Sequence, residues 1–423
     1  MKARPTLRES ELRVLESIDV DEIVRFVLEF IEIPTLGGDE AAGQDHVAGA
    51  MRRFGLEVET WEFAVSDLRG HPSFSMEVER DRGAGVVGRI GEAKGRTLLL
   101  NGHVDVVPPG DPGLWDDPPW RGTVRDGRIF GRGAADMKGG LACALFAAKA
   151  IRDSGTGLRG TLLLESVIGE EDGGLGTLAA SLRGYRGDGA IVLEPTGLKV
   201  APAQAGALSF RISIPGRAAH ASVREEGVSA IEKFLPVHEA LRELETSRNR
   251  ATQDPLFARY RLPYALSIGT LRAGNWPSSV PERLEFEGRY GVAVGEDLVS
   301  ARRQFEDAVL GASMADPWLR EHPPRVEWWG GQFEPASIPV DHPVATTLAG
   351  AHADATGRPT SFEGTPYGSD MRLLVNVART PTVLYGPGDV RDAHRPNESV
   401  RIDDLAAATR AVALAAIRFC GIE

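Results

Sequence analysis

Short apolar runs that end at an acidic or histidine side chain constrain this chain more than any other feature. The run Leu98 to Leu100 leads into His103, and the run Ile191 to Leu193 leads directly into Glu194. In an open α/β sheet, the carboxyl ends of the strands meet at one crevice, where residues distant in sequence converge. A buried carboxylate without a partner is costly, and a cation is the simplest partner. The pattern therefore predicts a shared metal site.

The segment Glu170-Glu171-Asp172 follows a further apolar run, Leu162 to Ile168. Three consecutive acids usually form a solvated loop. Their position after a buried strand favours another interpretation, in which one Glu binds metal and its neighbour acts as a general base. Adjacent residues of a regular strand point to opposite faces, so both roles together require an irregular backbone.

Asp136 closes a Gly-rich stretch, residues 131–136, that differs from a dinucleotide-binding fingerprint because Asp stands where a third Gly or an Ala is needed. We therefore reject a nucleotide site. Asp136 either caps the helix that follows it or uses both carboxylate oxygens to bridge two cations. His394 follows the apolar run 382–385 through a Gly-rich loop and is either a solvated histidine or a further ligand.

His103 and Asp105 are two residues apart, so on an extended segment they point to the same side. The Asp105 carboxylate could then accept a hydrogen bond from the second ring nitrogen of a metal-bound His103. An exposed loop pair is the alternative. His220 lies in the segment 216–222, away from these motifs, and spacing alone assigns it no role.

Length and charge narrow the class of protein. A chain of 423 residues exceeds the size at which single cores stop growing, so two or three domains are expected. A net charge of −12 argues against a nucleic-acid partner, which requires clustered Lys and Arg. No apolar run approaches the roughly 20 residues that span a bilayer, so we expect no membrane contact and a cytoplasmic location. The two cysteines, Cys143 and Cys420, fit neither a disulfide framework nor a thiolate metal site.

The order of the segments predicts an α/β fold in two parts. Helical and strand-like segments alternate up to Glu194, which is typical of crossover units and a mostly parallel sheet with helices on both faces. Residues 208–214 instead alternate apolar and polar side chains, as a strand with one solvated face does. The segments that follow match the β-α-β-β-α-β order of a ferredoxin-like unit. We therefore expect a split di-metal domain, 1–205 and 331–423, interrupted by an inserted ferredoxin-like domain, 206–330.

Taken together, these motifs resemble the metallopeptidase and deacylase superfamily that includes acetylornithine deacetylase, succinyl-diaminopimelate desuccinylase, aminoacylase-1 and glutamate carboxypeptidase. Six motifs occur in the family's order between residues 98 and 400. The resemblance implies two bound zinc ions, for which cobalt or manganese could substitute. It places one zinc on His103, Asp136 and Glu194. It places the other on Asp136, Glu171 and His394, with Asp136 as the bridge.

The same resemblance implies roles for further residues. Asp105 would orient His103, and Glu170 would be the general acid and base. The inserted domain would act as a lid and dimerisation domain of a homodimer. In that arrangement, His220 would reach the active site of the partner subunit and stabilise the oxyanion. The family's substrate-binding positions correspond to Asn275, Arg289, Gly368 and Ser369, with Ser369 in place of the family's Thr.

The function implied by the resemblance is hydrolysis of the amide bond of an N-acyl amino acid or a related small N-acylated amine. Glu194, where family aminopeptidases tend to carry Asp, favours the deacylase or carboxypeptidase branch. A dipeptidase or carboxypeptidase acting on small peptides is the alternative. A metal-dependent binding or scaffold protein would keep the ligands but would not need Glu170. The stretch 245–263 has no counterpart in the family and could shape the substrate pocket.

Overall fold

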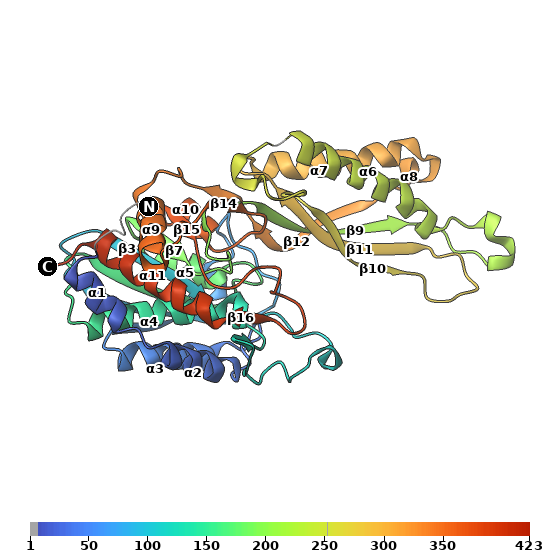
Figure 1. The fold of residues 1–423 in the computed structure, drawn as a ribbon. Helices are drawn as coiled ribbons and strands as arrows, with labels where there is room; N and C mark the ends of the chain where they lie inside the picture. Colours follow the sequence, from blue (N-terminus) through green and yellow to red (C-terminus); the bar gives the residue numbers. More distant parts are fainter. Residues whose placement is uncertain (1–6, 252) are drawn as a thin grey trace. The chain divides into compact units, whose positions relative to one another are not determined.

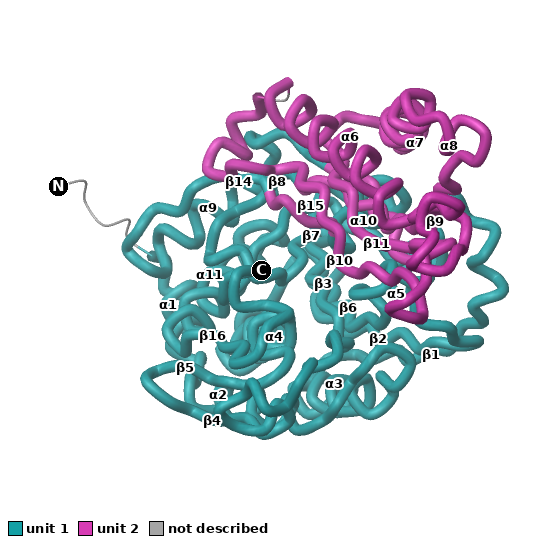
Figure 2. The backbone as a smooth tube through the Cα atoms, turned by 90° about the vertical axis from the view of Figure 1, so that its right-hand side faces the viewer, with its two compact units in different colours: residues 1–203, 337–364, 369–423 teal, residues 204–336, 365–368 magenta. Residues whose placement is uncertain are grey.

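The computed structural model of the chain describes residues 7–251 and 253–423. These residues divide into two compact units (Figure 2). The first unit comprises the described part of Met1–Ala203 together with Ser337–Gly364 and Ser369–Glu423. The second comprises Gln204–Ala336, without Thr252, and Thr365–Gly368. Thr252, inside the stretch 245–263, lies outside the described residues.

A nine-stranded sheet forms the centre of the first unit, and it confirms the predicted α/β class. Its central strands β6, β3, β7 and β15 run parallel to one another. Antiparallel strands flank this centre, with β2 and β1 beside β6 and with β8 beside β15. The strand bounds are β1 (Glu57–Ala64), β2 (Arg82–Gly91), β3 (Thr97–His103), β6 (Thr161–Val167), β7 (Gly189–Val192), β8 (Val200–Gln204), β13 (Ala336–Ser337), β14 (Phe362–Thr365) and β15 (Thr382–Leu384).

Helices cover both faces of this sheet, as the alternating pattern predicts. On one face, α4 and α11 lie side by side (Figure 1), and α3 and α9 also pack there. On the other face, α5 and α10 share an apolar cluster that includes Leu175, Leu178 and Leu373. The helix bounds in this unit are α1 (Glu9–Glu16), α2 (Val20–Ile31), α3 (Ala41–Arg53), α4 (Gly139–Asp153), α5 (Leu175–Arg183), α9 (Pro343–Thr356), α10 (Met371–Asn376) and α11 (Ile402–Cys420). A small antiparallel sheet of β4 (Thr123–Arg125), β5 (Arg128–Phe130) and β16 (Ser399–Arg401) completes the unit.

Sequence pattern explains where these helices begin and what they bury. The Asp19 side chain caps α2 by accepting hydrogen bonds from the backbone amides of Asp21 and Glu22. The apolar residues of α2 recur at helical spacing and are the buried ones, namely Ile23, Phe26, Val27, Phe30 and Ile31. Helix α4 is buried almost all round, which accounts for its run of Ala and Leu without an exposed polar face.

The second unit has the ferredoxin-like order of elements. Its sheet runs β10-β11-β9-β12, and every neighbouring pair is antiparallel. In β9, alternate side chains are buried against the helices, as the alternating sequence predicts, and they include Leu208, Phe210 and Ile212. The bounds are β9 (Gly206–Pro215), α6 (Ala230–Ala251), β10 (Leu266–Ala273), β11 (Arg283–Val292), α7 (Leu298–Ala315), α8 (Pro317–Glu321) and β12 (Arg325–Phe333).

The last two turns of helix α6, from Leu244 to Ala251, extend into the stretch 245–263. Arg248 stabilises these turns because it is nearly buried and pairs with Glu296 at 2.6 Å. Within the described residues, none of the helices combines the length and the apolar character needed to cross a bilayer.

Gly140, in the first turn of α4, lets this helix approach the end of β7 closely. A Cβ atom at Gly140 would lie 2.0 Å from the carbonyl oxygen of Leu193, the residue before Glu194. Backbone cannot yield as a flexible side chain does. The small residue therefore sets the distance between α4 and the strand end that carries Glu194.

We expect Gly140→Ala to destabilise the protein by about 1–3 kcal/mol, because the added methyl group overpacks a backbone contact. Gly49→Ala is the matched control, since Gly49 is also helical but faces only the Arg53 side chain, at 3.4 Å. There Ala should stabilise by up to about 1 kcal/mol through its higher helix propensity. Thermal unfolding of both variants checks this. Equal melting temperatures would contradict the packing argument.

Candidate metal centre

The carboxyl ends of three neighbouring parallel strands bring the predicted metal ligands of the first unit together. β3 ends at His103, β6 ends three residues before Glu170, and β7 ends two residues before Glu194. The strands are adjacent in the order β6-β3-β7, so their ends lie at one edge of the sheet. Strand polarity alone thus gathers side chains that are up to 91 residues apart in sequence.

The His103 imidazole lies at the centre of this cluster. Its Nε2 atom is 3.3 Å from Asp136 Oδ1, 3.9 Å from Glu170 Oε2 and 4.0 Å from Glu194 Oε1. His394 approaches from the C-terminal part of the chain, with its Nε2 3.0 Å from Glu171 Oε2 and 3.3 Å from Asp136 Oδ2. Asp136 therefore directs one carboxylate oxygen toward each histidine, which is the geometry that a bridging ligand requires.

This donor set fits divalent cations. Ligand atoms of His103, Asp136 and Glu171 lie within 4.8 Å of one another, as do those of His103, Glu170 and Glu194. Imidazole nitrogen with carboxylate oxygen is a typical environment for zinc and for several other divalent ions. His103 Nε2 is buried and makes no hydrogen bond with good geometry, so a cation would give this atom a partner.

Burial and mutual repulsion shift the pKa values of the cluster in the metal-free protein. Burial raises the pKa of Glu170 and of Glu194 well above the ordinary value. The charge of Glu194 raises the pKa of Glu170 further, and the charge of Asp136 does the same for Glu194. The charge of Glu171 raises the pKa of His394 to about 11. Burial also acts to raise the pKa of Asp136, but the nearby imidazoles of His103 and His394 outweigh it and lower the pKa. Glu170, Glu194 and His394 therefore hold protons more tightly than usual, and a bound cation would displace protons from its ligands.

Asp105 contacts the cluster differently from the prediction. The Nδ1 atom of His103 is 2.9 Å from the backbone oxygen of Asp105 but 3.7 Å from its carboxylate. The Asp105 carboxylate instead accepts a hydrogen bond from the backbone amide of Glu171, at 3.0 Å. The carbonyl fixes the ring of His103, and the side chain ties down the neighbouring turn.

Glu398 is a supporting residue that the sequence analysis missed. This fully buried carboxylate accepts hydrogen bonds from the backbone amides of Ala135, at 2.9 Å, and Asp136, at 3.0 Å. It also pairs with the buried guanidinium of Arg132 at 2.5 Å. Glu398 lies at the entry to β16, 262 residues from Asp136, in a stretch without a motif. No spacing signal could have found it.

A chain of buried polar side chains lies behind the cluster. Asn101 Nδ2 donates to Glu165 Oε2 at 3.2 Å and to Thr177 Oγ1 at 3.0 Å, and Thr177 donates to Asp370 at 2.6 Å. Burial raises the pKa of Glu165 to about 7 and that of Asp370 to about 6. Glu165 lies on the face of the sheet that α5 covers and belongs to no predicted site.

The predicted substrate-binding residues are divided between the units. Ser369 is in the first unit, where it is buried and its hydroxyl accepts a hydrogen bond from the amide of Met371. Asn275 and Gly368 belong to the second unit, and Gly368 packs so tightly on Phe333 that a Cβ atom would come within 2.5 Å of it. Ser369 thus lies two residues before the first residue of α10 and bonds to the backbone of that residue.

Arg289 and His220 also belong to the second unit. Arg289 donates to the carbonyl oxygen of Pro366 at 3.0 Å, and burial lowers the pKa of its guanidinium. Within residues 7–251 and 253–423, no carboxylate forms an ion pair with it. His220 is exposed and its Nδ1 lies 2.7 Å from the hydroxyl of Ser222.

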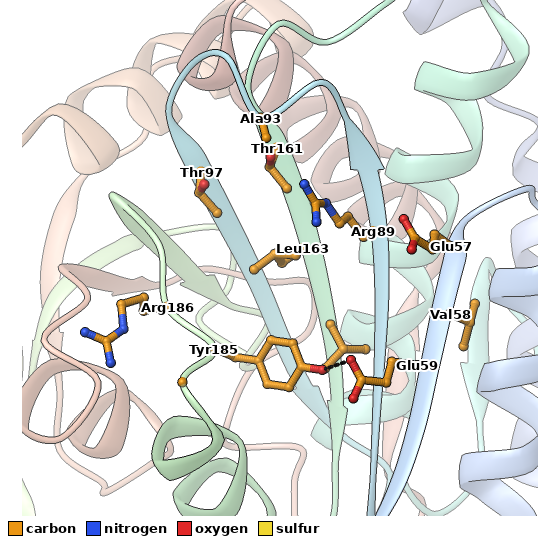
Figure 3. Close-up of a pocket in the computed structure, with 12 residues that line it drawn as sticks. Glu57, Val58, Glu59, Arg89, Ala93, Thr97, Thr161, Leu163, Tyr185 and Arg186 are labelled. Atoms are coloured by element: carbon orange, nitrogen blue, oxygen red, sulfur yellow. Dashed lines mark hydrogen bonds between the residues drawn. The ribbon is translucent and has the colours of Figure 1, made fainter.

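A cleft of about 540 Å³ in the first unit contains none of these groups (Figure 3). It is lined by residues of β1, β2 and β6 and by the turn after α5. Tyr185 donates there to Glu59 at 2.6 Å (Figure 3). The lining contains two carboxylates, Glu57 and Glu59, and two guanidinium groups, Arg89 and Arg186, so the cleft carries no excess of either charge. The cleft is large, but it contains none of the predicted ligands, so we do not assign the reaction to it.

Comparison with known proteins places the cluster in a family. Residues 99–418 match the profile of peptidase family M20/M25/M40. The chain belongs to this family. It is therefore a metal-dependent hydrolase of amide bonds, and the predicted superfamily is confirmed.

Two relatives and one solved structure illustrate the similarity. The chain is 29% identical to an N-formyl-4-amino-5-aminomethyl-2-methylpyrimidine deformylase of Halalkalibacterium halodurans, over 95% of each chain. It is 32% identical to a succinyl-diaminopimelate desuccinylase of Methylobacterium radiotolerans, over 91% of this chain and 93% of that one. The crystal structure of human carnosine dipeptidase 1 has the same fold, with a TM-score of 0.76 and 15% identity over 98% of this chain and all of that chain.

Glu165 gives the buried cluster a measurable pH dependence. A folded-state pKa of about 7, above the ordinary value of 4.5 for a glutamic acid, means that the folded protein binds this proton more tightly than the unfolded chain does. Stability from Glu165 is therefore present below pH 4.5 and is lost as the pH rises through 7. Glutamine imitates the protonated form, so Glu165→Gln should become more stable than the wild type as the pH rises, by on the order of 3 kcal/mol at pH 8.

Thermal unfolding between pH 5 and pH 8 measures this difference. The same replacement at exposed Glu16, in the last turn of α1, is the control and should give a difference that does not change with pH. A Glu165→Gln difference that stays constant over this range would show that the carboxyl group is not protonated in the folded state.

Proposed function

We propose that the protein is a di-zinc deacylase that hydrolyses the amide bond of an N-acyl amino acid or a related small N-acylated amine. The observation that carries this proposal is Glu170. This buried carboxylate stands next to the proposed ligand Glu171 and within 3.9 Å of His103, yet it is not needed to complete the set of metal ligands. A protein that only retained metal would have no use for it.

The two zinc ions would share Asp136, as its two oxygens suggest. His103 and Glu194 would complete the set for one ion, and Glu171 and His394 the set for the other. When bound, such ions lower the pKa of a water molecule and polarise a carbonyl group. Cobalt or manganese would suit the same donors.

Glu170 would move the proton during the reaction. It takes a proton from the attacking water as the new carbon–oxygen bond forms at the amide carbon. It then gives this proton to the amide nitrogen as the carbon–nitrogen bond breaks, so that a carboxylic acid and an amine leave. Asp105 would hold Glu171 in place through its backbone amide.

The names of the relatives favour an N-acylated substrate over a free peptide, and Arg289 suits a substrate of either kind that carries a carboxylate. The relatives with the highest similarity reported above are named a deformylase and a desuccinylase, and both names describe removal of an acyl group from nitrogen. Arg289 presents a half-buried guanidinium without a carboxylate partner among the described residues, which suits capture of a substrate carboxylate. We also propose that the substrate contacts Asn275, Gly368 and Ser369.

A dipeptidase or carboxypeptidase acting on small peptides is the second candidate. The fold it would use is that of the carnosine dipeptidase, which the chain matches over nearly its whole length. The two candidates differ in the group next to the scissile amide, since a dipeptidase must bind a free ammonium group.

A substrate panel with a Glu170→Gln variant tests the proposal. Zinc-loaded protein should hydrolyse N-formyl, N-acetyl and N-succinyl amines faster than unblocked dipeptides. Glu170→Gln should lose about 100- to 10,000-fold in turnover, because it cannot accept a proton, while it binds as much zinc as the wild type. Glu16→Gln is the control and should keep full turnover.

Three outcomes of this panel decide between the candidates. Faster hydrolysis of dipeptides would replace the proposal with the second candidate. Full turnover of Glu170→Gln at equal zinc content would remove Glu170 from the mechanism. Hydrolysis of no amide by fully loaded protein would refute the proposed substrate class.

We also propose a cytoplasmic homodimer, formed through the inserted unit, in which His220 acts on the partner's site. His220 lies in the second unit and is exposed, so it is available to a substrate bound elsewhere. His220→Ala should lose about 100- to 1,000-fold in turnover, the usual cost of one oxyanion donor. Mixing inactive His220→Ala with inactive Glu170→Gln should restore part of the activity if the residue acts in trans. Light scattering that shows a fully active monomer would contradict this arrangement.

A further inference from the structure

The turn that carries Glu170 and Glu171 is irregular, as the pairing of their roles requires. It begins at Gly169, with φ +66°, and passes through Gly173, with φ +143°. A Cβ atom at Gly169 would lie 2.8 Å from an Arg80 guanidinium nitrogen, so glycine is needed there for space as well as for conformation. Within the turn, the amide of Gly174 donates to the carbonyl of Gly169 at 2.7 Å. Such a backbone could adopt several shapes unless its surroundings select one.

Arg80 holds this turn through the side chain of Asp172. Its Nη2 lies 2.9 Å from Asp172 Oδ2, and its Nη1 lies 2.7 Å from Glu40 Oε1. The three side chains are only 6–8% exposed. Asp172 also accepts a hydrogen bond from the amide of Val78 at 2.8 Å. One guanidinium thus connects the turn after β6 to the first residue before α3.

Neighbouring residues of the turn are held from other directions. The amide of Glu171 donates to the Asp105 carboxylate, and the carbonyl of Gly173 accepts from Arg372 Nη2 at 2.7 Å. Arg372 is fully buried in α10 and also donates to the carbonyl of Ser73. Positions 171, 172 and 173 are therefore each fixed to a different part of the first unit.

Net stabilisation does not explain an ion cluster of this kind. Two carboxylates and one guanidinium lose their hydration on burial, and an apolar replacement of similar size is often as stable or more stable. The fork of Arg80 instead supplies direction, because it fixes two carboxylates in one plane. The group that it orients is one residue from Glu171 and two from Glu170.

We infer that Arg80 is a positioning residue for the hydrolytic site. Through Asp172, it holds the 169–174 turn in the one shape that points Glu170 at the reacting water and Glu171 at the metal. This inference rests on the proposed function, since it assigns Arg80 a role in presenting the proposed base and ligand. Arg80 itself contacts neither substrate nor metal.

Replacement of Arg80 should reduce turnover and zinc affinity together. Loss of an outer residue that orients a ligand commonly costs 10- to 100-fold, and we expect a fall of about that size in kcat for Arg80→Met. The zinc affinity of the metal-free chain, measured by chelator competition, should fall by a similar factor because Glu171 is on the same turn. KM should change by less than about 3-fold, as no substrate contact is lost. Arg80→Lys should retain intermediate values, since an ammonium group reaches one carboxylate at a time.

Arg418 provides the matched control. Its guanidinium also joins two carboxylates, Glu11 at 2.8 Å and Asp354 at 2.6 Å, but it connects α11 to α1 and α9. Arg418→Met should lower the melting temperature without changing kcat or zinc affinity. If Arg80→Met and Arg418→Met have the same kcat at matched thermal stability, Arg80 is only a structural residue.

A second variant keeps the test valid if Arg80→Met does not fold. Arg80→Met combined with Glu40→Gln and Asp172→Asn leaves no unpaired buried charge and should fold. It should still show reduced kcat and zinc affinity, and wild-type values for both would overturn the inference. The Glu170→Gln variant distinguishes an error in the role of Arg80 from an error in the proposed function. If that variant is inactive while Arg80 variants are normal, only the positioning role is refuted, whereas an active Glu170→Gln refutes the proposed base.

Discussion

Buried carboxylates are stable only with positive charge or protons beside them, and the site of the first unit is built around this requirement. Four acidic side chains and two imidazoles meet near the ends of parallel strands, where His103, Glu170 and Glu194 are buried and His394 is exposed. Their repulsion is balanced in the metal-free protein only by bound protons, which is why burial raises the pKa of Glu170 and Glu194 so far. A pair of divalent cations satisfies the same demand without protons. The buried arginines near the site then do not need to neutralise the ligand carboxylates. Arg80 and Arg132 pair with carboxylates outside the ligand set, and Arg372 donates to backbone carbonyl groups.

Those outer contacts separate the reactive groups from the elements that support them. Glu398 and Arg132 fix the backbone at Asp136, the carbonyl of Asp105 fixes the ring of His103, and Arg80 fixes the turn after β6. The contacts of Glu398 and of Arg80 join segments that are distant in sequence, whereas the contact of Asp105 with His103 is local. The precision of the cluster is therefore a property of the completed unit and not of any single motif.

Sequence reasoning recovers the parts of this structure that follow local rules. The strand that precedes each ligand is visible as an apolar run, and strand polarity is enough to bring His103, Glu171 and Glu194 to one edge. The alternation in β9 likewise predicts a half-covered sheet, and α2 and α4 follow from helical spacing and composition. Supporting residues such as Glu398 and Arg80 lie in segments without periodicity, so only the folded chain reveals them. The carboxylate of Asp105 lies 3.7 Å from His103 and bonds more closely to the amide of Glu171, because spacing on a strand does not show which atom the next loop will present.

The position of β15 affects how the chain can assemble during synthesis. This strand, from the last tenth of the sequence, inserts between β7 and β8, which are made about 180 residues earlier. The ribosome must therefore release Thr382–Leu384 before the large sheet can close, whereas the ferredoxin-like unit has all its strands by Phe333. Domains generally fold as units as they emerge. The inserted unit can thus fold while β7 and β8 still lack β15 between them. His394 is the last of the proposed ligands to be synthesised.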